Sequence, residues 1–203
     1  MKIFKYALVL YIFLPLQANA AMHQIKADGL YTHKASGMTF PLSIHNFQRV
    51  NVLQYDEKGL DVSAGYDLVS SMGDISATIY IFPAPRLTSF GSPANVIAGA
   101  RAKLSQDLFD RVKQEIFQHH TGVNLLQEKE ISLPQGDTAY SGEMATFEYE
   151  EIFAHRFQVV RSEVYLFCYV GKKWSIEYRF TYPKNYNGSQ EIEGFIQNFH
   201  WTL

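Results

Sequence analysis

Apolar and polar residues alternate along most of this chain, with the two-residue period of a strand that buries one face. The alternation is clearest over residues 163–183, which predict two long strands joined by a tight turn. In the second strand Trp174 and Tyr178 fall on one face, and Glu177 and Arg179 fall on the other. The first strand is apolar on both faces, as expected of a central strand covered on two sides.

Further strands are predicted at residues 47–55, 60–68, 75–82, 123–133, 139–153 and 155–160. A long amphipathic helix is predicted over residues 93–119, because apolar residues recur every three or four positions from Val96 to Ile116. At about 1.5 Å per residue, this helix is long enough to cross a sheet of about five strands. A short amphipathic helix follows near the C-terminus, with Ile192 and Phe195 on its apolar face.

This order of elements predicts an α+β fold with a largely antiparallel sheet, because most strands follow one another through short turns. No internal repeat or linker divides residues 21–203, so a single domain is expected. The inner strands need cover on both faces. The two helices can lie on one side of the sheet or on both, and the second arrangement would be an α/β/α sandwich.

The pattern resembles the PsbP-like group of α/β/α sandwiches, which includes the photosystem subunit PsbP, Mog proteins and DcrB-like periplasmic proteins. The resemblance rests on residues 38–41 in an early strand, 74–81 before a helix, 174–182 in the last strand and 192–199 in the last helix. These are packing patterns that cover nearly the whole chain after residue 20. The resemblance implies a non-enzymatic binding or assembly module that acts through partners.

Residues 1–20 have the composition of a secretory signal peptide. Lys2 and Lys5 precede an apolar run over residues 6–16, and Ala18-Asn19-Ala20 forms a cleavage signal. An uncleaved membrane anchor is the alternative, but the run is short for a bilayer about 30 Å thick. We therefore predict a mature chain that begins at Ala21, is periplasmic or secreted, and has no stable membrane insertion.

Composition narrows the functional classes only slightly. The net charge is −2 and the basic residues are scattered, which argues against nucleic-acid binding. Cys168 is the single cysteine, so no intramolecular disulfide can form. The alternation places Cys168 on one face with Leu166 and Val170, where a buried, unreactive thiol is expected.

One pair of residues suggests a metal site. Glu115 and His119 lie four residues apart in the predicted helix and would share one face, whereas His120 would point elsewhere. No third ligand is visible. A polar helix C-terminus explains the histidines equally well, so we predict no bound metal or cofactor, with Glu115 and His119 as the candidate pair.

Acidic residues gather in the predicted strand at residues 139–153, and they are Glu143, Glu148, Glu150 and Glu151. They would serve as paired carboxylates in acid–base catalysis or as a cation site. The alternative is cross-strand pairing with Arg156 and Arg161 on a solvated face, and Glu177 and Arg179 are interpreted in the same way.

Tyrosine and tryptophan are abundant in the last hairpin, and most of these rings are assigned to the core. Tyr182 and Tyr186, near its end, are the candidate partner contacts. We therefore predict an exported, non-catalytic protein that binds a partner protein or an envelope component, and we assign no catalytic residue. The alternatives are an envelope hydrolase or metal-dependent enzyme with a dispersed site, and an inhibitor or immunity-type protein.

Overall fold

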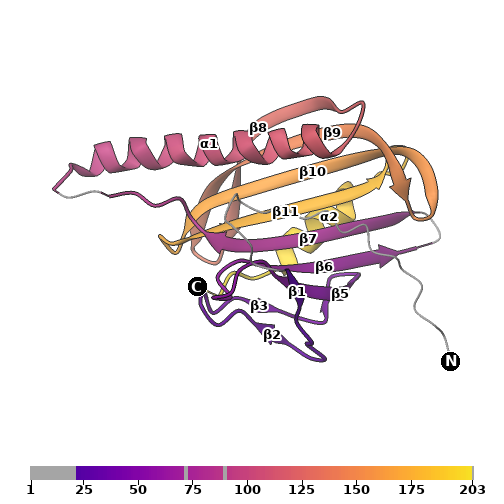
Figure 1. Ribbon diagram of the computed structural model, residues 1–203, viewed down its shortest axis with the longest axis horizontal. Coiled ribbons are helices and arrows are strands. Elements are labelled where there is room, and N and C mark those ends of the chain that lie inside the picture. The colour runs from indigo at the N-terminus through magenta and orange to yellow at the C-terminus, as the bar shows by residue number, and fades with distance from the viewer. Residues whose placement is uncertain (1–21, 71–72, 89–90, 203) are drawn as a thin grey trace.

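The computed structural model describes residues 22–70, 73–88 and 91–202 (Figure 1). The predicted signal peptide therefore lies outside the described residues. The strands are β1 (His23–Gln24), β2 (Tyr31–Thr32), β3 (Thr39–Phe40), β4 (Ser43–Ile44), β5 (Phe47–Gln54), β6 (Val62–Val69), β7 (Asp74–Pro83), β8 (Asn124–Gln135), β9 (Thr138–Phe153), β10 (Arg156–Val170) and β11 (Trp174–Pro183). The helices are α1 (Ala94–His119) and α2 (Ser189–Asn198), and neither is both long and apolar enough to cross a membrane.

The main sheet has nine strands in the order β1-β5-β6-β7-β11-β10-β9-β8, with β4 paired beside β5. Every pairing in the described part is antiparallel, including the separate β2–β3 pair. The α+β prediction is thus confirmed. Two antiparallel runs, β5–β7 and β8–β11, join through the β7–β11 pair, because the connection through α1 carries the chain to the far edge.

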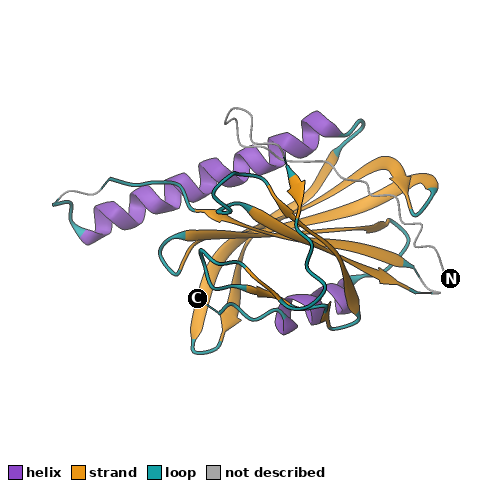
Figure 2. Ribbon diagram, turned by 60° about the horizontal axis from the view of Figure 1, so that its bottom comes forward, coloured by secondary structure: helices purple, strands orange, loops and turns teal. Residues whose placement is uncertain are grey.

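Strand alternation separates two hydrophobic cores on opposite sides of this sheet, and Figure 2 shows the sheet lying between α1 and α2. We call these sides the α1 face and the α2 face. The α2 face carries the larger core, in which Tyr66, Tyr178 and Phe180 pack with Phe195 of α2 and with Phe199. These five side chains are almost fully buried, so apolar packing holds α2 against the sheet.

The α1 face has a smaller core. Phe109, Val112 and Ile116 of α1 pack on a row that includes Phe147 of β9 and Val164 of β10. Since this row follows the strands, α1 lies along β10 instead of crossing the sheet, as Figures 1 and 2 show. The long helix predicted over residues 93–119 therefore runs along the strands, and its first turns extend past the end of the sheet.

Two details of the face assignments also differ from expectation. A bulge in β10 shifts the register between Phe167 and Val170, and Tyr169 adopts a φ of 58°. Val170 consequently joins the α2-face core, whereas Cys168 packs on the α1 face. The polar face of β11 is not solvated, because α1 covers it; Glu177 is only 3% exposed.

Candidate functional site

A charged layer lies between α1 and the sheet. Arg179 of β11 donates to the carboxylate of Glu177, and its Nη2 lies 3.6 Å from Oε2 of Glu115 on α1. The guanidinium carbon also lies 5.2 Å from the ring centre of Tyr80 on β7. Arg179 thus ties α1 to two central strands through charge and ring contacts.

Carboxylates outnumber cations in this layer. Asp61, just before β6, has its pKa raised to about 7, first by burial and then by the charges of Asp56 and Glu177. Burial likewise raises the pKa of Glu115 to about 7, although Arg179 opposes the shift. Of these two carboxyl groups, Glu115 has Arg179 as its partner, whereas Asp61 lies among like charges.

A second polar contact holds the C-terminal end of α1. The ring of His120 stacks on Tyr149 with centroids 3.9 Å apart, and its Nδ1 lies 3.4 Å from Oε2 of Glu151. Burial lowers the pKa of His120 to about 4 and raises that of Glu151 to about 7. The spacing is that of an ion pair, but burial disfavours both charges, so we describe it as a polar contact involving a neutral imidazole.

The candidate metal pair is not brought together as a site. Glu115 faces Arg179, and His119 is exposed near the end of α1. Within the described residues, no group of three or more His, Cys, Asp or Glu side chains is arranged to hold a metal ion. The side chain of Glu115 instead has a structural partner.

The candidate partner contacts are placed differently from one another. Tyr182 is 2% exposed, and its hydroxyl donates to Glu163, which also accepts a 2.6 Å hydrogen bond from Tyr165. A side chain buried in this way does not fit the predicted contact with a partner. Tyr186 is half-buried against Tyr182, and its proposed role stays a prediction.

The acidic strand divides between the two faces. Glu148 accepts from Arg161 at 2.8 Å, as the cross-strand interpretation predicts, and also from Lys184 at 2.7 Å. These two hydrogen bonds lower the pKa of Glu148. Glu143 has the opposite parity along β9 and lies on the α1 face, away from both cations.

One hollow lies on the α1 face. This α1 cavity, of about 540 Å³, opens between the middle of α1 and the strands β8, β9 and β10. Its polar lining comes from Ser105, Glu130, Ser132, Ser141 and Glu143, and Cys168 lies at its floor. Burial raises the pKa of the Cys168 thiol, so the thiol is protonated and a poor nucleophile at neutral pH.

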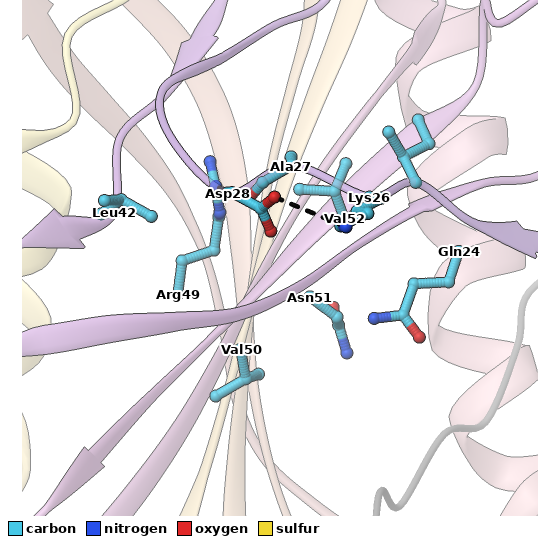
Figure 3. A pocket seen from close by; sticks show the side chains of 10 residues that line it. Gln24, Lys26, Ala27, Asp28, Leu42, Arg49, Val50, Asn51 and Val52 are labelled. Carbon is cyan, nitrogen blue, oxygen red and sulfur yellow. Dashed lines mark hydrogen bonds and ion pairs between the residues drawn. The ribbon is translucent and has the colours of Figure 1, made fainter.

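A smaller hollow of about 200 Å³ lies at the other end of the sheet, between β5 and the segment after β1 (Figure 3). Arg49 occupies its side, and its guanidinium donates to the carbonyls of Phe40, Ala27 and Gly29. These bonds fasten the N-terminal segment to β5. The Lys26–Asp28 pair seen in Figure 3 is almost fully exposed. The polar groups of Arg49 at this hollow therefore have partners in the N-terminal segment, and we assign the hollow no ligand.

Exposed apolar side chains lie on both faces of the sheet near the end of α1: Phe117 and Leu125 are on the α1 face with Phe147, whereas Ile152 and Phe157 are on the opposite face by strand alternation. We call the pair Ile152 and Phe157, at the turn from β9 to β10, the apolar end. Ile152 and Phe157 are 63% and 70% exposed and lie directly opposite each other in the β9–β10 register. Large contiguous patches of exposed apolar surface mark interaction sites, and this pair is the candidate for such a patch here.

The turn beside this pair is strained. Ala154 and His155 both have positive φ, at 49° and 64°, which is the pattern of a two-residue type I′ turn. Neither is glycine or asparagine, so each costs about 1 kcal/mol. Backbone strain of this kind is often kept where it presents neighbouring side chains for function.

Sequence reasoning missed the α1 cavity and the apolar end. The parity of Glu143 along its strand, odd like that of Phe147, was a usable signal for its face. Its pairing opposite Glu130 depends on the β8–β9 register, which the sequence does not state. The exposure of Ile152 and Phe157 depends on how far α2 reaches across the sheet.

Comparisons with known protein families and with curated proteins find no match to this chain.

Proposed function

We propose that this chain is an exported, non-catalytic binding protein that recognises a partner protein through the apolar end. We also propose that its fold is a PsbP-like α/β/α sandwich, which the sheet between α1 and α2 supports. The observation that carries the functional proposal is the exposed pair Ile152 and Phe157 beside the strained turn. The apolar surface of this pair is exposed to water. A partner that covered it would bind more tightly, because burial of apolar surface is favourable.

The placement of charged groups supports a binding role. Arg179, Arg161 and Lys184 contact carboxylates within the protein, where they position α1 and the last strands. These three cations are thereby committed to contacts within the protein. Export is supported by the pattern of residues 1–20, which would place the protein in the periplasm of a two-membrane cell.

Site-directed photocrosslinking tests the proposal in the full-length chain expressed in a two-membrane bacterium. A photoreactive residue replaces Phe157 in one variant and Leu30, which is 65% exposed and lies before β2, in the control. We expect a discrete crosslinked protein at position 157 only, and its loss when Ile152 is also changed to Thr. Equal crosslinking at both positions, or none at position 157, would contradict a docking role for the apolar end.

Export is tested separately on the same protein. Cell fractionation and N-terminal sequencing should recover a periplasmic chain that begins at Ala21. Recovery of the chain from the cytoplasm with Met1 retained would contradict export. Turnover of substrates from a hydrolase panel by the purified chain would instead favour the enzyme alternative.

A further inference from the structure

The α1 cavity contains a like-charge pair. Glu130 of β8 and Glu143 of β9 are direct partners in the strand register, and both line the cavity. Two carboxylates placed directly opposite on one face repel each other. Nothing in the packing of the β8–β9 pair requires acidic residues at these two positions.

One of these carboxylates has an unsatisfied atom. Oε2 of Glu143 is buried and has no hydrogen-bond partner. A buried oxygen without a donor costs free energy, and the cost is larger when the group is charged. Burial raises the pKa of Glu143, with further contributions from the acidic groups Glu128, Asp110 and Glu130, while Lys113 opposes the rise.

In the described part of the chain, neither Lys113 nor Arg101 of α1 forms a hydrogen bond to Glu143. Nζ of Lys113 lies 2.9 Å from Asp110 and 2.8 Å from Glu128. The guanidinium of Arg101 packs over the ring of Tyr169, with its carbon 5.0 Å from the ring centre, and its Nε is buried without a hydrogen-bond partner. No lysine or arginine lines the cavity itself.

The remaining lining suits an organic molecule. Ser132 and Ser141 are also directly opposed across β8 and β9, and Ser105 adds a third hydroxyl from α1. Ala102 and Leu166 supply apolar surface. A volume of about 540 Å³ lies within the range of small-molecule sites, whereas a bare divalent cation would require more oxygen ligands than two carboxylates provide.

We propose that the α1 cavity binds a small organic ammonium ion, whose charged group lies between Glu130 and Glu143 and whose apolar part faces Leu166. A protonated amine supplies the donor that Oε2 of Glu143 lacks and removes the repulsion between the two carboxylates. The serine hydroxyls accept or donate to the rest of the ligand. This inference stands independently of the apolar end, which lies elsewhere on the surface.

The single cysteine provides the assay. Cys168 lines the cavity, so a bound molecule should shield its thiol from iodoacetamide, which is applied at mildly alkaline pH because burial raises the pKa of this thiol. The probe is putrescine, and 1,4-butanediol is its uncharged analogue of similar shape. We expect putrescine to slow alkylation by about tenfold once its concentration is about ten times its Kd, and butanediol to have little effect.

Variants separate a specific site from general attraction to an acidic protein. Glu143→Gln should weaken protection by putrescine at least about tenfold. Glu150→Gln, which removes an exposed charge from the other face of β9, should leave protection unchanged. Isothermal titration calorimetry on the same samples gives the Kd directly, should Cys168 react too slowly to follow.

Several results would overturn the proposal. They are equal protection by butanediol, equal loss of binding in Glu143→Gln and Glu150→Gln, and the absence of measurable putrescine binding by calorimetry. Protection by Mg²⁺ or Ca²⁺ without protection by putrescine would also overturn it, in favour of a metal site.

Discussion

The α2 face of the sheet is closed by interlocking aromatic rings, whereas the α1 face is closed by one helix over a layer of charged and hydroxyl side chains. The same strands supply both faces. On β11, Tyr178 and Phe180 point into the aromatic core, while Glu177 and Arg179 point toward α1. The fold therefore buries most of its core side chains on the α2 face and leaves the α1 face with a smaller core, a cavity and an excess of carboxylates.

The largest expected difference between the faces is in core substitutions. Phe195 lies 4.8 Å from Phe47 and 5.4 Å from Tyr66 and Phe180, by ring centroids. Phe195→Ala should lower the free energy of unfolding by about 4–5 kcal/mol. Phe109→Ala, at an equally buried position on α1, should cost only about 3 kcal/mol because the helix can shift to fill the space. Urea denaturation measures both, and equal costs would remove the contrast between the faces.

Removal of the Arg179 charge from the charged layer should lower the stability of the protein. Arg179→Met leaves Glu177 buried beside Glu115 without a counter-charge, and it should destabilise the protein by about 3 kcal/mol. The double variant Glu177→Gln/Arg179→Met should recover more than half of that loss. The control Arg156→Met, at an exposed position, should change stability by less than about 0.5 kcal/mol. If Arg179→Met behaves like this control at pH 7, the layer does not stabilise α1.

The smallest expected effect is the contribution of Asp61 to the pH dependence of the free energy of unfolding. The folded-state pKa of Asp61, about 7, lies above the ordinary value near 4. The folded protein therefore binds more protons than the unfolded chain between these values, and ionisation of Asp61 lowers stability as pH rises through this window. Asp61→Asn should match the wild type near pH 4 and exceed it by about 1–2 kcal/mol at pH 8. This difference is less than the roughly 4 kcal/mol that a rigid site would give for a pKa raised from about 4 to about 7, because water screens this partly exposed carboxylate. Denaturation at several pH values measures this difference, and a pH-independent one would show that Asp61 is not buried as a charge.

Much of the fold could be predicted from local pattern. The alternation of Leu60 to Leu68, the hairpin turn with Gly59 at a φ of 64°, and the helix ending at His119 all follow from neighbouring residues. The Glu148–Arg161 contact was also predictable, because the tight turn between β9 and β10 fixes which residues face each other. These features depend on interactions over short sequence distances.

The candidate sites could not be predicted in the same way. Glu130 and Glu143 become a pair only through the β8–β9 register, and their cavity exists only because α1 lies above them. The partner of Glu115 could not be predicted for a related reason. Arg179, which is distant in sequence, lies beside its carboxylate in the folded protein. A side chain's chemistry is set by its neighbours in space, which one sequence does not specify.

The sequence by itself determined most of the long strands, the two helices and the division of most residues between two faces, because strand and helix periods are local properties of the chain. The tertiary structure decided the β7–β11 pairing, the direction of α1 along β10 and the burial of Glu177. These depend on contacts between distant segments, where total burial and charge pairing select one arrangement among several with the same local pattern.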